Sequence, residues 1–257
     1  MKVIGASTSF ISTRTGSMVL RSRGRVARFA LALVLVVVLA AVFLVGWAAS
    51  DLPAIDDLLQ TNSLSADSMP IKPDRLPPYL PQALVAAEDR QFYQHFGVNP
   101  LAIARAIYVD LRAEQLLQGG STITEQLAKN LLESKSKSKL WQKLQEMILA
   151  IRLERRLSKE RILELYLDRA YFGSGAFGIR AAEKPYFGKS VSQVSLYEAA
   201  MLIGLLRAPS RYNPAHSRVL ADERARAVLQ SMVDMGFLTE AEFHEAIEEE
   251  SIRPRQT

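Results

Sequence analysis

Apolar positions beyond residue 83 recur every three or four residues, which is the spacing of a helix with one face in a core. Alternating runs typical of strands are hard to find, and breaks rich in Gly, Pro or Ser separate the helical segments. The pattern predicts helices over 99–117, 122–132, 138–157, 159–170, 195–207, 220–235 and 239–250. We therefore expect a compact all-α domain without internal repeats.

Three of these helices begin with the sequence of a capping box, in which a Ser or Thr is followed three residues later by Glu. They are Thr122-x-x-Glu125, Ser195-x-x-Glu198 and Thr239-x-x-Glu242. Because such a pair satisfies free N–H groups at a helix start, the boxes support the predicted boundaries.

The predicted helix 138–157 has an apolar side and a polar side. The apolar side carries Leu140, Leu144, Met147, Ile148 and Ile151. Glu146 points nearly opposite, beside Lys143 three residues earlier, and such a pair on a helix surface contributes about 0.2–0.5 kcal/mol. Taken alone, this pattern predicts a surface ion pair.

A different pattern occupies 29–49, where 21 residues follow one another without a charge. This length is enough to cross a bilayer core of about 30 Å. The residues before it include six basic side chains, and no acid occurs until Asp51. By the positive-inside rule we expect a cytoplasmic basic tail over 1–28, a transmembrane anchor over 29–49 and an extracytoplasmic remainder. A cleaved signal peptide is the alternative, but its apolar region usually spans about 7–15 residues.

The segment after the apolar run is rich in Pro, Asp and Ser through residue 82. This composition predicts extended turns. We therefore expect a linker over 50–70, followed by the folded domain over 71–257.

The net charge of +5 comes from the N-terminal tail, because residues 51–257 hold 26 basic and 27 acidic side chains. Nucleic-acid binding is therefore not expected. Charge is segregated within this part: 135–161 is basic and 222–250 is acidic. The basic stretch suits phosphates or anionic lipid, or a solvated helix face.

The chain contains no cysteine and only three histidines. Disulfides, thiol nucleophiles and cysteine-based metal sites are thereby excluded, and the histidines form no zinc pattern.

The stretch 83–99, ALVAAEDRQFYQHFGVN, ends an apolar run in two adjacent acids, Glu88 and Asp89. One explanation is that the helix simply reaches the surface there. The other is that a carboxylate is held at the rim of a cleft, where burial raises its proton affinity.

The stretch 118–133, QGGSTITEQLAKNLLE, brings two glycines to the start of a helix. Free N–H groups at such a start favour an anion, and Thr122, Gln126 and Lys129 share one face as a candidate phosphate site. The alternative is a capped helix with a Glu125–Lys129 pair, since Glu125 would compete with a bound anion.

Two formal motif matches do not carry their usual meaning. GSGAFG at 173–178 fits the dinucleotide fingerprint but follows a helix instead of a strand. Ser134-x-x-Lys137 lies in a Lys/Ser stretch and no K-T-G follows it.

Five segments in a fixed order carry a resemblance over about 70–250. They are EDRQFYQHFG at 88–97, GGSTITEQLAKN at 119–130, QKLQE at 142–146, KERILELYL at 159–167 leading to YFGSGAFGIRAAEKPYFGK, and SLYEAAMLIGLLRAPSRYNP at 195–214. Together they resemble the glycosyltransferase domain of peptidoglycan polymerases, namely the monofunctional transglycosylases and the first domain of bifunctional class A penicillin-binding proteins.

The resemblance implies a lysozyme-like all-α fold at the bacterial cytoplasmic (inner) membrane. It implies lipid II and the growing glycan strand as substrates, with inversion at the anomeric carbon and release of undecaprenyl diphosphate. Glu88 would be the general base on the acceptor 4-hydroxyl. Glu146 would be a second essential carboxylate, near the diphosphate or a divalent cation (Mg²⁺ or Mn²⁺), and no organic cofactor is expected. Wall-synthesis proteins of cell division or elongation are the protein partners it allows.

Seven further residues match family positions that the resemblance implies are substrate-binding. The donor-site matches are Thr122, Gln126, Lys129 and Lys143, and the first-motif matches are Asp89, Phe92 and His95. Glu164 and Tyr166 match the fourth motif and are expected to be structural.

The chain departs from the family pattern at three positions. Glu125 stands where Gln is usual, Gln142 where Arg is usual before Lys143, and Asp168 where Asn is common. An added carboxylate and a lost guanidinium both disfavour a dianionic leaving group. We expect slower catalysis, a greater need for metal, or use of the lysines at 135–139.

Three functions remain as hypotheses. The first is a membrane-anchored monofunctional polymerase, since the sequence ends at Thr257 without a transpeptidase domain. The second is a lysozyme-like lytic enzyme using Glu88 as acid. The third is an impaired, lipid II-binding scaffold protein, which Glu125 and Gln142 motivate.

Overall fold

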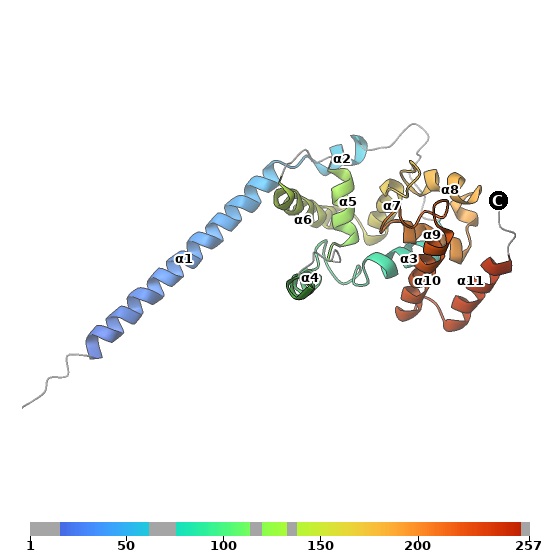
Figure 1. Ribbon diagram of the computed structural model, residues 1–257. Helices are drawn as coiled ribbons and strands as arrows, with labels where there is room; N and C mark the ends of the chain where they lie inside the picture. The colour runs from blue at the N-terminus through green and yellow to red at the C-terminus, as the bar shows by residue number, and fades with distance from the viewer. Residues whose placement is uncertain (1–15, 62–75, 114–119, 133–137, 253–257) are drawn as a thin grey trace, which may run out of the picture. The chain divides into compact units, whose positions relative to one another are not determined.

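The described part of the chain is helical, as predicted (Figure 1). The computed structural model describes residues 16–61, 76–113, 120–132 and 138–252. Within these ranges the only β-structure is two isolated bridges, Phe96 with Val98 and Tyr171 with Phe177. The chain divides into two units, Met1–Trp47 and Ala48–Thr257.

The first unit is dominated by one helix. Helix α1 (Gly16–Ser50) contains the predicted anchor 29–49 and extends it toward the N-terminus. Its stretch Leu31–Ser50 is long and apolar enough to cross a membrane, and most of its large apolar side chains are exposed. No other helix in the described ranges meets both criteria.

The second unit contains the remaining helices. They are α2 (Ile55–Thr61), α3 (Tyr79–Glu88), α4 (Pro100–Ala113), α5 (Ile123–Leu131), α6 (Lys139–Arg156), α7 (Lys159–Arg169), α8 (Ile179–Phe187), the 3-10 turn η2 (Val191–Gln193), α9 (Leu196–Leu205), α10 (Arg218–Asp234) and α11 (Glu240–Ile252). All seven helices predicted by range are present. Their ends agree within two residues, apart from the predicted end at 117, which lies outside the described residues.

Polar side chains begin most of these helices. Thr122, Ser138, Ser158, Ser195 and Ser217 each accept a backbone N–H from the first turn that follows. The capping boxes predicted at Ser195 and Thr239 form in both directions. The third forms in one direction, since Thr122 caps α5 while the Glu125 carboxylate turns to another partner.

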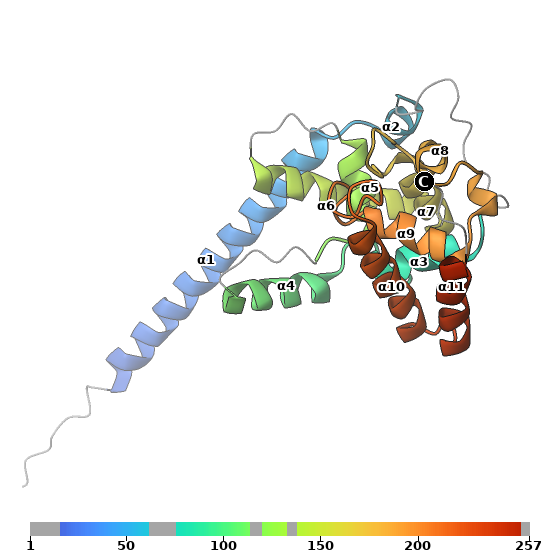
Figure 2. The ribbon, with the colours of Figure 1, turned by 45° about the vertical axis from the view of Figure 1, so that its right-hand side comes forward.

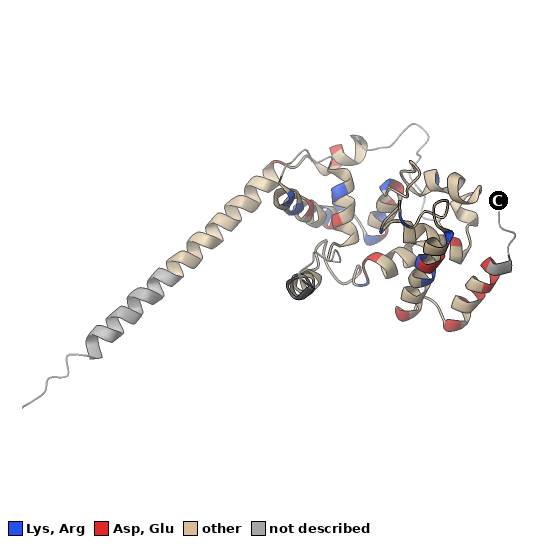
Figure 3. Ribbon diagram, viewed as in Figure 1, with Lys and Arg blue, Asp and Glu red and all other residues tan. Residues whose placement is uncertain are grey.

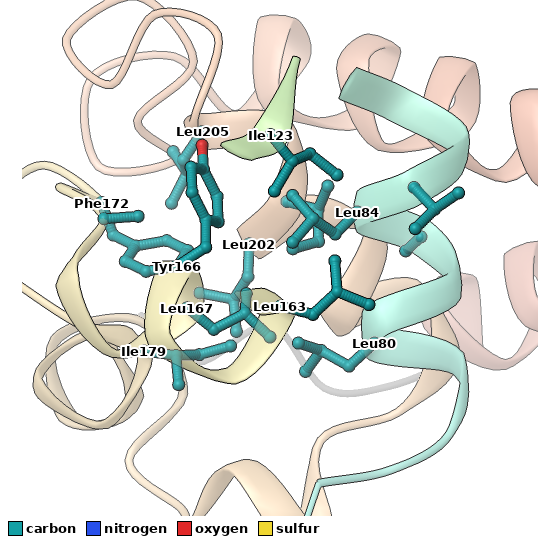
Figure 4. Packing of buried hydrophobic residues seen from close by; sticks show 14 of the residues in the cluster. Leu80, Leu84, Ile123, Leu163, Tyr166, Leu167, Phe172, Ile179, Leu202 and Leu205 are labelled. Atoms are coloured by element: carbon teal, nitrogen blue, oxygen red, sulfur yellow. The ribbon is translucent and has the colours of Figure 1, made fainter. Parts of the chain in front are cut away.

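The core of the second unit is built around α9, whose residues are buried on every side. Helices α3 and α10 pack against α9 and against each other, and α5 packs against α6 and α7. Figure 4 shows leucines of α3, α7 and α9 converging with Ile123, Phe172 and Ile179. The turned view in Figure 2 shows α10 and α11 side by side.

The predicted linker over 50–70 is wrong for 55–61. These residues form α2, and Leu52 and Leu58 are buried in the same apolar cluster as the other helices. Two acids in the first turn of α2, Asp56 and Asp57, favour the helix through its dipole. The folded unit therefore begins well before residue 71.

The orientation predicted for α6 is also wrong. Leu140 is 85% exposed, whereas the buried side includes Gln145, Glu146 and Glu154 together with Leu149. Buried acids are tolerated when they are paired. Glu154 accepts hydrogen bonds of 2.7 Å from Thr124 and from Lys159, and these contacts offset the desolvation of its carboxylate.

Glycines close the turn between α7 and α8. Gly173, Gly175 and Gly178 all have positive φ. At Gly178 a Cβ atom would lie 2.4 Å from the carbonyl oxygen of Asp168, so no larger residue fits without displacing the backbone. The glycine motif at 173–178 is thus a tight turn that follows a helix, in line with the rejection of a dinucleotide site.

Candidate active site

Glu88 is the last residue of α3, at the point where this core helix ends. The preceding residues, including Leu80, Leu84 and Val85, are buried and fix the helix end. The Glu88 side chain is 15% exposed. Its Oε2 accepts a hydrogen bond of 3.0 Å from Gln126 Nε2. The carboxylate is therefore held at the edge of the core with limited access to solvent.

Burial is the largest influence on the pKa of Glu88 and raises it above the usual value. The hydrogen bond from Gln126 and the charges of Arg224 and Arg207 lower the pKa, while Asp89 raises it slightly. The net direction is upward. A carboxylate with a raised pKa is a stronger proton acceptor than a solvated one.

Tyr166 orients the amide that contacts Glu88. Its hydroxyl donates a hydrogen bond of 2.7 Å to Gln126 Oε1, so the amide presents its NH₂ group to Glu88. Burial, and secondarily the Glu88 charge, raise the pKa of Tyr166, which remains a neutral donor. Sequence analysis treated Tyr166 as structural, but the contact makes it part of the support of Glu88.

The residues of the first motif join α3 to α5. Asp89 Oδ2 accepts the N–H of Ile123 at 3.1 Å and lies 2.8 Å from His95 Nε2. The side chains of Asp89 and His95 are 5% and 6% exposed. Phe92 is fully buried, its ring nearly perpendicular to that of His95, and the Lys159 ammonium lies 4.4 Å from the Phe92 ring centre.

Phe92, which was predicted to bind substrate, is fully buried, so its ring packs inside the core and exposes no surface in this structure. The side chains of Asp89 and His95 contact each other and help to hold this junction together. Together these side chains fix the end of α3 relative to the start of α5.

The predicted phosphate site on α5 is only partly available. Thr122 is buried, caps the helix, and donates a hydrogen bond of 2.6 Å to the Gly97 carbonyl. Gln126 is engaged by Glu88 and Tyr166. Lys129 is exposed one turn further along the face of Gln126. Of the three predicted donors, Lys129 is the one left exposed to meet an anion.

Two further carboxylates, those of Glu125 and Glu146, lie around Lys143 on α6. The Lys143 ammonium contacts Glu125 Oε2, donates a hydrogen bond of 2.8 Å to Ser121 Oγ, and lies 3.7 Å from Glu146 Oε2. The sequence allowed a Glu125–Lys129 pair, but the partner of Glu125 is Lys143. Figure 3 shows basic and acidic residues interspersed on α5 and α6.

Glu146 is more buried than its sequence pattern predicted. Burial raises its pKa, and the charges of Lys143 and Lys129 lower it. The expected placement of Glu146 on the exposed face of α6 is wrong. Lys143 and Lys129 provide its cationic surroundings.

Helix α5 connects the surroundings of Glu88 with those of Glu146. Gln126 contacts Glu88, and the preceding residue, Glu125, contacts the lysine beside Glu146. Two acids far apart in the sequence are thus tied to one helix. The lysines at 135 and 137 lie outside the described residues.

Arg224 is the residue that sequence analysis missed. Its Nη2 lies 4.0 Å from Glu88 Oε1. Within the described chain its Nε and Nη2 are buried without a hydrogen-bond partner. Its spacing in the sequence was an available indication. Arg224 follows the buried Ala221 by three residues and precedes the buried Val228 by four, so it lies on the core side of α10.

Gly204 on α9 makes room for Arg224. A Cβ at this position would lie 2.8 Å from Arg224 Cγ, so even alanine would displace the arginine side chain. The helix α9 therefore lets the arginine stem pass close to its backbone on the way to Glu88.

The chain belongs to the Transglycosylase family, whose family model matches residues 57–233. The resemblance inferred from the ordered motifs is therefore confirmed. The match also begins before residue 71, in agreement with the position of α2.

Several penicillin-binding proteins are similar to this chain. Penicillin-binding protein 1A of Aquifex aeolicus is 47% identical over 174 residues, covering 68% of this chain and 24% of that protein. Penicillin-binding protein 1A of Escherichia coli is 45% identical over 175 residues, covering 68% and 20%. Penicillin-binding protein 1B of Vibrio cholerae is 43% identical over 181 residues, covering 69% and 23%. The chain thus spans a quarter or less of these relatives.

Among solved structures, penicillin-binding protein 1A from Haemophilus influenzae is similar at 24% identity and a TM-score of 0.41. The similarity covers 70% of this chain and 17% of that one.

Proposed function

We propose that the protein is a peptidoglycan glycosyltransferase that polymerises glycan strands from lipid II. The observation that carries the proposal is the Glu88 carboxylate, held with little exposure at the end of α3 and contacted by Gln126. Membership of the Transglycosylase family and the similarity to penicillin-binding proteins support the reaction class.

In the proposed reaction Glu88 removes the proton from the 4-hydroxyl of the acceptor sugar. The oxygen attacks the anomeric carbon of the growing strand, and the bond to the lipid diphosphate breaks with inversion. The diphosphate leaves with the bonding electron pair, and Glu88 holds the proton until solvent accepts it. Because the base must be ionised, the raised pKa of Glu88 has to remain below the working pH.

Cationic side chains support the leaving group as negative charge accumulates on it. Lys129 is exposed next to the face that holds Gln126, and its charge acts on Glu146. In this proposal Lys129 and Lys143 contact the departing diphosphate, while Glu146 orients Lys143.

The lipid tail of the proposed substrate gives a reason for a membrane anchor. We propose that α1 crosses the bacterial inner membrane once, with the basic N-terminus in the cytoplasm and the catalytic unit outside. An anchored enzyme and a lipid-linked substrate are confined to one surface. Wall-synthesis proteins of division or elongation are the partners such a location allows.

Glu88→Gln in the full chain tests the proposal. Labelled lipid II is incubated with wild type, Glu88→Gln, and Glu223→Gln as a control at an exposed acid of α10. Glycan strands are resolved by gel electrophoresis. We expect Glu88→Gln to lose about 10²–10⁴-fold in rate, with Glu223→Gln unchanged. Retention of wild-type polymerisation by Glu88→Gln would refute the assignment of the base.

A lipid II-binding scaffold is the second candidate. The ion pair between Glu125 and Lys143 supports it, since this pair neutralises a cation otherwise available to the diphosphate. Binding of labelled lipid II by wild type without any polymer, under all metal conditions, would favour the scaffold. Release of soluble muropeptides from purified sacculi would instead indicate a lytic enzyme.

A further inference from the structure

Lys143 lies among three oxygen-bearing side chains from two helices and the turn before α5. Its ammonium contacts Glu125 Oε2 and Ser121 Oγ, and it lies 3.7 Å from Glu146 Oε2. We call these four residues the Lys143 cluster. A lysine has three N–H donors, so this set of oxygens can satisfy and orient the whole ammonium group.

Glu125 is the member that fixes the lysine. Its side chain is fully buried, whereas that of Lys143 is 38% exposed. In the described part of the chain Glu125 Oε1 has no hydrogen-bond partner, so the contact with Lys143 is what compensates the buried carboxylate. A buried anion with one cationic partner strongly restrains that partner. Lys143 is therefore held in place.

The Lys143 cluster does not fit a divalent cation. Mg²⁺ and Mn²⁺ prefer several oxygen ligands, commonly one or two carboxylates with waters and substrate phosphates. The carboxylate expected to bind metal, Glu146, has an ammonium 3.7 Å from its Oε2. A divalent ion on that oxygen would be repelled by this charge.

We propose that Lys143, fixed by Glu125, is a resident ammonium that takes the place of a divalent cation beside Glu146. This inference rests on the proposed function. The departing diphosphate meets the Lys143 ammonium together with Lys129, and polymerisation proceeds without divalent ions. Glu125 is a positioning residue, since it acts through Lys143. The greater need for metal expected from the sequence is replaced by the opposite expectation.

Metal binding by the protein itself gives the first test, independent of activity. Free Mn²⁺ is measured by electron paramagnetic resonance in solutions of the detergent-solubilised full chain. Wild type should leave Mn²⁺ free, whereas Lys143→Met, which frees Glu125 and Glu146, should bind at least about tenfold more tightly. Lys143→Arg keeps the charge and should behave as wild type. Lys139→Met, at an exposed lysine of the same helix, is the matched control.

The opposite result in this test would overturn the inference. Stoichiometric Mn²⁺ binding by wild type, abolished in Glu146→Gln, would show that the site accepts a metal despite Lys143. Equal, weak binding by wild type and by a folded Lys143→Met would show that Lys143 does not exclude the ion. Thermal unfolding of each variant establishes that it is folded.

Polymerisation with and without chelator gives the second test. Wild type should form glycan at rates within about threefold in EDTA and in Mg²⁺. Glu125→Gln keeps the shape but removes the charge that holds Lys143, so its rate in EDTA should fall at least about tenfold relative to its own rate in Mg²⁺. A wild type that polymerises only with metal would overturn the inference and leave the proposed function intact. Absence of polymer under every condition would refute the proposed function, and the Mn²⁺ measurement would still decide the role of Lys143.

Discussion

Replacing Arg224 by methionine removes the cation nearest to Glu88 while keeping a side chain of similar length. Arg224 Nη2 and Glu88 Oε1 are 4.0 Å apart, and both side chains are 15% exposed. At an effective dielectric constant of about 20, two unit charges at about 4 Å interact by about 4 kcal/mol. This energy is the upper limit of the effect of Arg224 on the pKa of Glu88.

The observed shift should be smaller than this limit. Arg207 also lowers the pKa of Glu88 and remains in the variant, and the hydrogen bond from Gln126 is unchanged. Neighbouring opposite charges usually shift a carboxyl pKa by about 1–3 units. We expect Arg224→Met to raise the pKa of Glu88 further, beyond the increase that burial already causes.

The sign follows from the proposed role of the ionised Glu88 carboxylate as the base. Activity is lost as the pH falls through the pKa of Glu88 in the folded protein, so a higher pKa moves the acidic limb of the rate profile to higher pH. The assay is kcat/KM for lipid II polymerisation between pH 5 and 9. Arg226→Met, at an exposed arginine of the same helix, should leave the limb in place.

Stability provides a second measurement of the same shift. A carboxyl group with a raised pKa binds its proton more tightly in the folded state, so its burial costs stability as the pH rises from the unfolded to the folded pKa. The melting temperature of Arg224→Met should therefore fall more between pH 5 and 8 than that of Arg226→Met. Gly204→Ala, which displaces the arginine stem, should change both measurements in the same direction.

If folded Arg224→Met has its acidic limb of the rate profile at the same pH as wild type, this reasoning is refuted. Such a result would mean that the guanidinium is screened from Glu88 despite their separation, or that Glu88 does not govern the acidic limb.

Three further predictions concern the support of the site. Tyr166→Phe removes the donor to Gln126 Oε1, so the amide loses its fixed orientation; kcat should fall about tenfold with little change in KM, as measured by steady-state polymerisation. Asp89→Asn weakens a charged hydrogen bond to the start of α5, and the free energy of unfolding in urea should fall by about 1.5–3 kcal/mol. Gly178→Ala should lower the melting temperature by clearly more than Gly175→Ala, because both have positive φ but a Cβ clash occurs only at the former; equal losses would show that backbone strain alone decides.

Much of the fold follows from local patterns. Helical periodicity and Ser or Thr at helix starts depend on neighbours within one or two turns, which is why α5, α7 and α9 match their predicted ranges closely. The acid pair that ends the apolar run was also visible as a local feature, whereas the role of Glu88 as general base was implied only by the resemblance.

The remaining features depend on partners far along the chain. The apolar residues of α6 predicted its buried face wrongly, because Glu154 is buried against Thr124 and Lys159. The pairing of Glu125 with Lys143 instead of Lys129 has the same origin. Arg224 faces Glu88 only once α10 packs on α3 and α9. A single sequence gives no information on such pairings.

Helix α5 is nine residues long and bears on both carboxylates through adjacent side chains. In the proposed reaction, a small tilt of this helix would change proton removal from the acceptor sugar and departure of the lipid diphosphate together. If the proposed reaction holds, a compound that binds the exposed side of α5 and displaces the helix disables both parts of the reaction without resembling either substrate.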